Sequence, residues 1–282
     1  MDVRREIAAL LGPVVVDIAP LGGGCVSAVY EIHLADGRQL VVKADDNGAD
    51  NLAVEATMLS YLAERGLPTP AVVAMSNRLL VMEYVAGDSL FDAAAESHAA
   101  ELLAALHGQT APAFGFDSDT LIGGLRQPNT PNVHWLDFFA EQRLVYMAGE
   151  AARAGRLPAT TRARVERLAG RVGEWLVEPA RPALIHGDVW TTNVLARAGR
   201  ITAFLDPAIY YADPEIELAF IGLFGTFGRA FHEAYHSLRP IAPGFFEERR
   251  DLYNLYPLLV HVRLFGGSYV GQVERTLAGY GF

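Results

Sequence analysis

The sequence has few of the features that mark secreted, membrane-bound or nucleic-acid-binding proteins. Its 282 residues include one cysteine, Cys25, which excludes an internal disulfide and a multi-cysteine zinc site and agrees with a reducing compartment. No apolar run approaches the roughly 18 residues of a membrane span, and the start lacks the apolar segment of a signal peptide. Lysine and arginine number 23 against 33 acids, a net charge of −10, whereas nucleic acids and anionic membranes demand a basic face. These absences predict a soluble cytoplasmic protein with neither kind of partner.

The chain does contain an ordinary globular mixture, with 51% hydrophobic and 20% charged residues and no internal repeat. Before about residue 85, short β-type runs dominate, and they fall at 14–16, 28–34, 40–43, 72–74 and 79–84. Asp36-Gly37 predicts a hairpin turn between two of them, and one helix is expected over 51–65, with Gly66 as its C-terminal cap.

After residue 90 the pattern is mostly helical, with helices expected at 99–107, 134–150, 161–176, 217–237 and 247–265. A β-type segment over 183–205 interrupts them. The sequence therefore predicts an α+β fold of two lobes, a small antiparallel-sheet lobe over residues 1–85 and a larger, mainly helical lobe over 86–282, with a cleft between them.

A glycine-rich segment, Gly22-Gly23-Gly24-Cys25-Val26-Ser27, lies between two β-type runs and fits G-x-G-x-x-G with Ser27 in the last glycine position. Glycines let a backbone approach phosphate and direct N–H groups at it. A flexible connection between strands has the same composition, so the segment alone does not identify a nucleotide site.

Two charged residues fall at positions expected to be buried. Lys43 ends the apolar run Leu40-Val41-Val42, and Glu55 shares a helical face with apolar residues. Because a buried carboxylate is costly unless paired, we expect a Lys43–Glu55 ion pair that holds the ammonium toward nucleotide phosphates. The alternative is a lysine that extends to water at a strand end.

The segment His186-Gly187-Asp188-Val189-Trp190-Thr191-Thr192-Asn193 precedes a β-type run that ends in Leu205-Asp206. A hairpin turning at Gly199-Arg200 would set Asn193 directly opposite Asp206, and two such oxygen ligands suit Mg²⁺ carrying a nucleotide's phosphates. Asp188 would then accept the proton of an attacking hydroxyl. The alternative is a loop whose Asp and Asn cap turns.

The order of these motifs resembles the protein-kinase-like phosphotransferase fold. In that fold the segment linking the lobes binds adenine through its backbone, and here Glu83, Tyr84 and Val85 occupy the corresponding place. An edge strand followed by a loop would have the same sequence pattern, so this segment alone does not distinguish the two.

The resemblance narrows to the fructosamine kinase family, also called ketosamine 3-kinases. It rests on the glycine-rich segment, on Trp190 two places after Asp188 and on segments that together span nearly the whole chain: 114–116, 122–123, 127–129, 135–139, 205–211, 243–245 and 264–269. Members of this family transfer the γ-phosphate of ATP to the 3-hydroxyl of ketosamines, and the unstable product releases the amine, which is a deglycation.

The resemblance implies roles for individual residues. Asp188 would be the base, Asn193 and Asp206 the Mg²⁺ ligands, and Lys43 with Glu55 the phosphate clamp. Trp190 would line the sugar pocket or only pack the loop, and His186 would support the loop through hydrogen bonds. The acceptor would be a small ketosamine or a glycated protein amine, and the chain a monomer or a homodimer.

The chain also departs from the family pattern. Thr191-Thr192 replaces Ser-Gly, Glu217 replaces an Asp, and Pro257 and Val260 interrupt the C-terminal pattern. These changes remove no chemical group, but they bear on substrate preference. A related kinase acting on an aminoglycoside- or choline-like hydroxyl is the main alternative, and a pseudokinase scaffold is disfavoured because all five kinase-type residues are present.

Two further features were weighed. His232-Glu233-Ala234-Tyr235-His236 satisfies the H-E-x-x-H pattern of zinc hydrolases, although its apolar residues are equally typical of a packing helix. Cys25 within the glycine-rich segment is either a redox-sensitive thiol whose oxidation lowers ATP turnover or an inert small residue.

Overall fold

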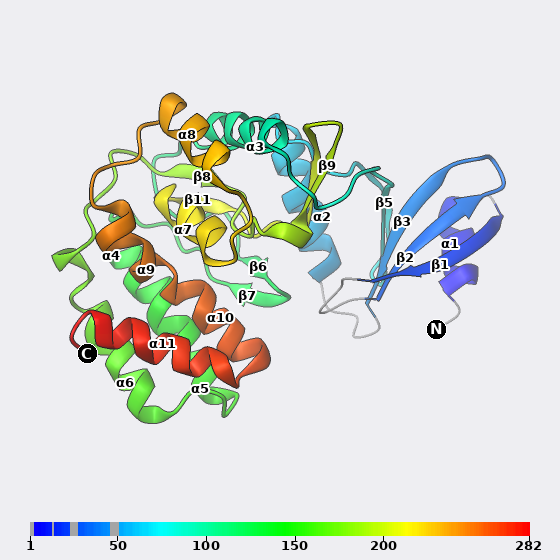
Figure 1. The fold of residues 1–282 in the computed structure, drawn as a ribbon. Helices are drawn as coiled ribbons and strands as arrows, with labels where there is room; N and C mark the ends of the chain where they lie inside the picture. The colour runs from blue at the N-terminus through cyan, green and yellow to red at the C-terminus, as the bar shows by residue number, and fades with distance from the viewer. Residues whose placement is uncertain (1–2, 13, 23–27, 46–50) are drawn as a thin grey trace.

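The computed structural model describes residues 3–12, 14–22, 28–45 and 51–282. It has a small antiparallel sheet at one side of a larger, mainly helical body, which confirms the predicted fold class (Figure 1). No helix among the described residues is long and apolar enough to cross a membrane.

The N-terminal sheet consists of five antiparallel strands in the order β1-β2-β3-β5-β4. Their bounds are β1 Val15–Leu21, β2 Ala28–Leu34, β3 Gln39–Ala44, β4 Val72–Met75 and β5 Leu79–Glu83. The turn between β2 and β3 is the predicted one, with Gly37 at φ +86° and its N–H bonded to the Leu34 carbonyl at 2.9 Å. A helix that the sequence pattern did not reveal, α1 (Val3–Leu11), precedes the sheet.

The two faces of the sheet are covered by different helices. On one face, Val42 packs in a buried cluster with Val81 and with Ile7 of α1. On the other face, Leu80 and Met82 pack against α2 (Asn51–Ala63). Because side chains alternate along a strand, Lys43 emerges on the α2 face.

Helix α2 joins the two parts of the molecule. Its residues Leu52 and Leu59 pack on the sheet, whereas Met58 and Leu62 belong to the core of the helical body. The helix ends at the predicted glycine, since Gly66 adopts φ +84° and the Leu67 N–H bonds to the Leu62 carbonyl at 3.1 Å. Glu55 is therefore carried on a helix that is fixed from both sides.

The helical body begins with α3 (Ala93–Leu106), capped by the Asp92 carboxylate, which accepts the Ala95 N–H at 2.8 Å. The remaining helical segments are α4 Trp135–Phe138, η1 Phe139–Val145, α5 Tyr146–Arg153, α6 Ala159–Ala169, η2 Val172–Glu174, η3 Thr191–Asn193, α7 Glu215–Leu223, α8 Arg229–Leu238, η4 Phe245–Arg249, α9 Arg250–Tyr253, α10 Leu255–Phe265 and α11 Ser268–Gly279. Three two-stranded ribbons complete it: β6 Thr120–Ile122 with β7 Leu125–Gln127, β8 Ala183–Ile185 with β11 Tyr210–Ala212, and β9 Val194–Arg197 with β10 Arg200–Phe204.

Several predicted boundaries are wrong. The single helix expected over 217–237 is two helices, α7 and α8, because the chain turns at Gly225 with φ +62°. The helix expected over 247–265 is divided at Asn254 into α9 and α10. The ribbon β6–β7 and the helix α11 were not predicted.

The cap of α2 gives a test of how Gly66 fixes that helix. A Cβ at Gly66 meets no atom within 4 Å, so Gly66→Ala adds strain only through its positive φ. We expect it to lower the free energy of unfolding by about 1 kcal/mol. Gly279→Ala is the matched control, because its Cβ is equally unobstructed and its φ is not positive. Denaturant melts that show equal stability for the two variants would contradict this account.

Candidate functional site

The ribbon β9–β10 sets the position of the predicted metal-binding residues. Its turn lies at Ala198 and Gly199, both with positive φ, and not at Gly199-Arg200 as predicted. This turn displaces the pairing by two residues from the predicted register, and a shift of register between Ile201 and Ala203 restores one of them. As a result Asn193 lies opposite Leu205, whose N–H it binds at 2.8 Å, and the predicted direct pairing of Asn193 with Asp206 is wrong.

Asp206 follows immediately, with φ +51°, a conformation that is costly for a residue other than glycine. The chain therefore bends where the strand ends and turns this carboxylate toward the same cavity as Asn193. The two side chains are brought together by a bend of the backbone and not by strand register.

One cavity between the sheet, α2 and the helical body collects six of the predicted site residues. Its lining includes Lys43, Glu55, Asp188, Trp190, Asn193 and Asp206. The described lining does not include Glu83, Tyr84 or Val85. The predicted loop residues Gly23, Gly24, Cys25 and Ser27 lie outside the described residues, and Gly22 is the exposed residue after β1.

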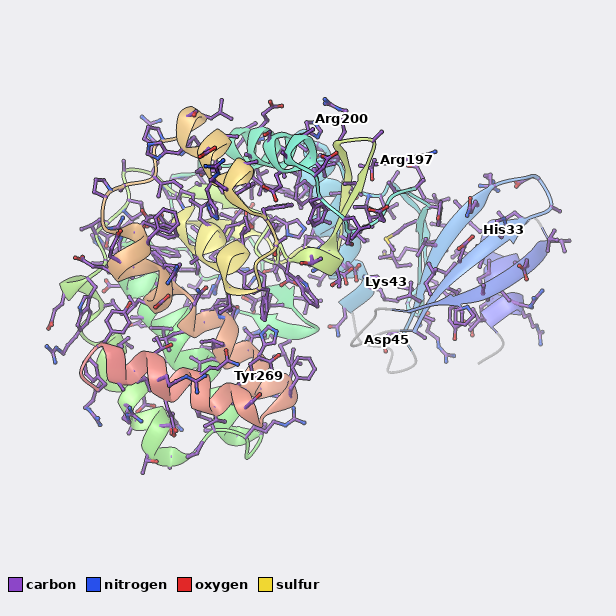
Figure 2. The ribbon with its side chains drawn as sticks, viewed as in Figure 1. His33, Lys43, Asp45, Arg197, Arg200 and Tyr269 are labelled. Atoms are coloured by element: carbon purple, nitrogen blue, oxygen red, sulfur yellow. The ribbon has the colours of Figure 1, made fainter. Side chains whose placement is uncertain are left out.

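Lys43 lies on the side of the sheet that faces the helical body (Figure 2). Its Nζ is 2.5 Å from Glu55 Oε1, so the ion pair expected from the sequence is present. The same ammonium also donates to Asp206 Oδ1 across the cavity. Burial alone would lower the pKa of Lys43, but the two carboxylates outweigh it and raise the pKa above its ordinary value. Lys43 is therefore a fixed positive charge at the cavity wall.

Asp188 is oriented by Asn193. Asn193 Nδ2 donates to Asp188 Oδ2 at 2.9 Å and to the Asp188 carbonyl at 3.1 Å. The Asn193 Oδ1 atom remains as an acceptor, and Asp188 Oδ1 has no hydrogen bond from the described residues. Burial and the nearby Asp206 carboxylate raise the pKa of Asp188 well above its usual value. A carboxylate with a raised pKa and a free oxygen is suited to accept a proton.

His186 is fully buried behind this loop. Its Nδ1 accepts the Asp188 N–H at 3.2 Å, which assigns the ring proton to Nε2. Burial lowers the pKa of His186, so the ring is neutral. The next residue, Gly187, has φ +85°, and a Cβ there would lie 2.2 Å from the Ala208 carbonyl oxygen. The loop backbone is thus held in one conformation.

A second buried carboxylate anchors the same backbone. Glu217 on α7 accepts the Gly187 N–H at 2.6 Å and the His186 N–H at 3.3 Å. His107 at the end of α3 donates to it from Nε2 at 2.8 Å, and Tyr235 OH lies 2.6 Å from His107 Nδ1. Burial alone would raise the pKa of Glu217, but these donors lower it, so the carboxylate stays ionised.

Sequence reasoning missed the role of Glu217 and His107. Glu217 was noted only as a departure from a family pattern. It lies, however, among Ile216, Leu218 and Ala219, and a carboxylate in an apolar helical run is the same signal that pointed to Glu55.

The H-E-x-x-H segment does not form a metal site. Among the described residues, no three His, Cys, Asp or Glu side chains are placed to hold a metal ion. His236 Nδ1 instead accepts the Ile241 N–H at 3.1 Å. Glu96 caps this helix, with oxygens 2.9 Å from Gly228 N and 3.2 Å from Phe231 N, so α8 is a packing helix.

The comparisons with solved structures define the class. A crystal structure of a candidate fructosamine-3-kinase from Thermobifida fusca superposes with a TM-score of 0.87 at 33% identity over 98% of this chain and 97% of that chain. An aminoglycoside phosphotransferase, APH(4)-Ia, in a ternary complex with AMP-PNP and hygromycin B superposes with a TM-score of 0.70 at 20% identity over all of both chains. The second likeness shows the fold alone. Together they define a phosphotransferase of the kinase-like fold.

The sequence comparisons give the family. A family model described as Fructosamine kinase matches residues 2–280, so the chain belongs to the fructosamine kinase family. A protein of Vibrio parahaemolyticus named a probable ketoamine kinase is 34% identical over 91% of this chain and 90% of its own length. A similarly named protein of Synechocystis is 43% identical, but that alignment covers 62% of this chain and 58% of the relative.

The role of Glu217 in holding the loop can be tested by replacing its carboxylate with an amide. Glu217→Gln replaces one acceptor oxygen by a donor that would face the N–H groups of the loop and of His107. We expect a loss of about 2–4 kcal/mol in unfolding free energy, and a fall in kcat of about tenfold or more with a smaller change in KM. Glu217→Asp should recover part of kcat.

Glu233→Gln is the control, because Glu233 is an exposed carboxylate on α8. If the Glu217→Gln enzyme melted early but kept its kcat below the melting range, Glu217 would serve stability alone.

Proposed function

We propose that the protein is an ATP- and Mg²⁺-dependent kinase that phosphorylates the 3-hydroxyl of ketosamines. The observation that carries the proposal is the convergence of Lys43, Glu55, Asp188, Asn193 and Asp206 on one cavity in a chain of the fructosamine kinase family. An aminoglycoside- or choline-like acceptor is the competing proposal, and acceptor assays separate the two.

The nucleotide would lie against the N-terminal lobe, for which we take residues 1–85, and the acceptor against residues 86–282. Lys43, held by Glu55, would contact phosphate oxygens, and Gly22, Gly23, Gly24 and Ser27 would supply backbone N–H groups around them. The backbones of Tyr84 and Val85 make no hydrogen bond to any described residue, so their N–H and carbonyl groups would be available for adenine, whereas the Glu83 N–H is bonded to the Ala71 carbonyl.

Asn193 and Asp206 fit a magnesium ion. Asn193 directs its amide nitrogen to Asp188, which leaves its oxygen as a ligand, and Asp206 contributes a carboxylate on the opposite strand end. Mg²⁺ in kinases is held by one or two such oxygens together with the phosphates, and when bound it neutralises the charge that develops on them. The Lys43 ammonium would exchange part of its contact with Asp206 for contact with phosphate.

Asp188 would act on the acceptor. Asp188 lines the cavity and Asn193 binds its Oδ2, so a hydroxyl bound there would donate its hydrogen bond to Oδ1. Transfer of that proton to Asp188 accompanies attack of the oxygen on the γ-phosphorus and departure of ADP. Positioning and charge neutralisation would supply most of the rate, because phosphoryl transfer needs little covalent help.

The product would be a ketosamine 3-phosphate, whose breakdown releases the amine and so reverses a glycation. Trp190 lines the same cavity two residues from Asp188, with its ring 5.9 Å from that of Phe224. A wall of this kind suits the apolar face of a sugar. ATP consumption measured across ribulose-, erythrulose- and fructose-derived amines beside an aminoglycoside panel tests the proposal, and turnover confined to aminoglycosides would reject it.

Asp188→Asn tests the assigned base. The amide preserves size but does not accept a proton, so we expect kcat to fall by about 10²–10⁴-fold. Nucleotide affinity, measured by calorimetry with ATP and Mg²⁺, should stay within about threefold. Asp36→Asn, in the exposed β2–β3 turn, is the control and should behave as wild type. Unchanged turnover in Asp188→Asn would refute the role.

A further inference from the structure

Three aromatic rings, those of Trp190, His261 and Phe265, line the part of the cavity beyond Asp188, and the rings of Phe224 and Tyr269 contact them from outside the lining. Trp190 packs on Phe224, and Phe224 on His261 with ring centres 5.1 Å apart. The ring centre of His261 is 5.7 Å from that of Phe265 and 4.8 Å from that of Tyr269. Tyr269 lies in the first turn of α11 (Figure 2). We call these five residues the aromatic wall.

The wall opens to solvent at its outer end. Phe265 is 53% exposed although it lines the cavity, and it joins Leu264, Val260 and Pro257 of α10 in the same lining. Trp190, His261 and Phe265, together with these α10 side chains, therefore form a largely apolar side of the cavity between the loop that carries Asp188 and the outside. A group attached to a bound sugar would leave the cavity along this surface.

The same cavity has almost no positive charge to offer. Among the described lining residues, Lys43 is the only lysine or arginine, and it is already paired with Glu55 and Asp206. The thirteen residues that the structure does not describe, 1–2, 13, 23–27 and 46–50, include no lysine or arginine in the sequence. The described lining also carries the carboxylates of Glu55, Asp188, Asp206 and Glu217.

His261 does not supply the missing cation. Its Nδ1 lies 2.7 Å from the Pro257 carbonyl, which only accepts, so the ring proton is on Nδ1 and Nε2 presents a lone pair. Burial lowers the pKa of His261, which keeps the ring neutral. The wall thus presents ring faces and one acceptor nitrogen, and none of these groups compensates the charge of a carboxylate.

We propose that the aromatic wall receives the group carried by the ketosamine nitrogen and selects substrates in which that group is an uncharged alkyl or aryl chain. Adducts of free α-amino acids, whose carboxylate carbon is two bonds from the nitrogen, are disfavoured because this carboxylate would lose water among carboxylates and rings with no cation to meet it. The inference rests on the proposed function and names the substrate class within it.

Two matched acceptors isolate the charge. Adducts of one ketose with glycine and with glycinamide are nearly equal in size and differ in the carboxylate. We expect kcat/KM for the glycinamide adduct to be about tenfold or more higher, mainly through KM. Equal values for the two adducts would overturn the selection against carboxylates.

Phe265→Ala tests the wall itself. The ratio of kcat/KM for a benzylamine adduct to that for a methylamine adduct should fall about fivefold, because the benzyl ring loses its aromatic contact. Phe246→Ala is the control, since Phe246 is similarly exposed but lies outside this cavity lining, and its ratio should match wild type.

The outcomes of these experiments distinguish a failure of the aromatic-wall proposal from a failure of the proposed ketosamine kinase activity. An unchanged ratio in Phe265→Ala would overturn the role of the wall, while turnover of any ketosamine adduct would leave the proposed function standing. Absence of turnover with every adduct would overturn both.

Discussion

The site depends on one largely buried ammonium held between two carboxylates. Lys43 is 12% and Glu55 16% exposed in their side chains, and Asp206 reaches the same ammonium from the helical body. Removing one partner of a buried pair costs about 3–5 kcal/mol, because the other charge is left uncompensated. The contact therefore ties together the sheet, helix α2 and the end of β10, which are the three elements that the nucleotide would contact in the proposed reaction.

A second buried carboxylate, that of Glu217, holds the loop that carries Asp188. Glu217, on α7, is fully enclosed and ionised, and its partners are the N–H groups of His186 and Gly187 and the His107 ring. A carboxylate with several donors is stable in a low-dielectric interior only if each donor keeps its geometry. The orientation of the loop that carries Asp188 is thus fixed by residues of α7 and of the end of α3, both distant from the loop in the sequence.

The sequence allowed correct predictions where the free-energy cost of an arrangement can be read from neighbouring residues in the chain. A carboxylate on an apolar helical face must find a partner, and this argument located Glu55 and its pairing with Lys43. The same argument was available for Glu217 in its apolar run. The short β-type runs also located all five strands of the small sheet, with each end within one residue, except that β1 extends to Leu21.

The sequence failed where backbone geometry decides. The register of β9–β10 depends on a turn at Ala198-Gly199 and on a bulge beyond Ile201, and neither has a distinctive residue pattern. The division of 217–237 depends on a positive φ at Gly225, which a helix pattern does not exclude. The aromatic wall joins residues of the catalytic loop, α7, α10 and α11, so only the packing of these helices reveals it.

Acidic residues outnumber basic ones in the whole sequence, and they also do so in the described lining of the cavity, which limits what the cavity can bind. A nucleoside triphosphate carries about four negative charges, and the described lining adds several carboxylates while offering one ammonium. Backbone N–H groups contribute only partial charges. In the proposed reaction a divalent cation would separate the phosphates from the carboxylates of Asp188 and Asp206, which would otherwise repel them at close range. Asn193, Asp206 and the single lysine would then be complementary parts of one charge balance.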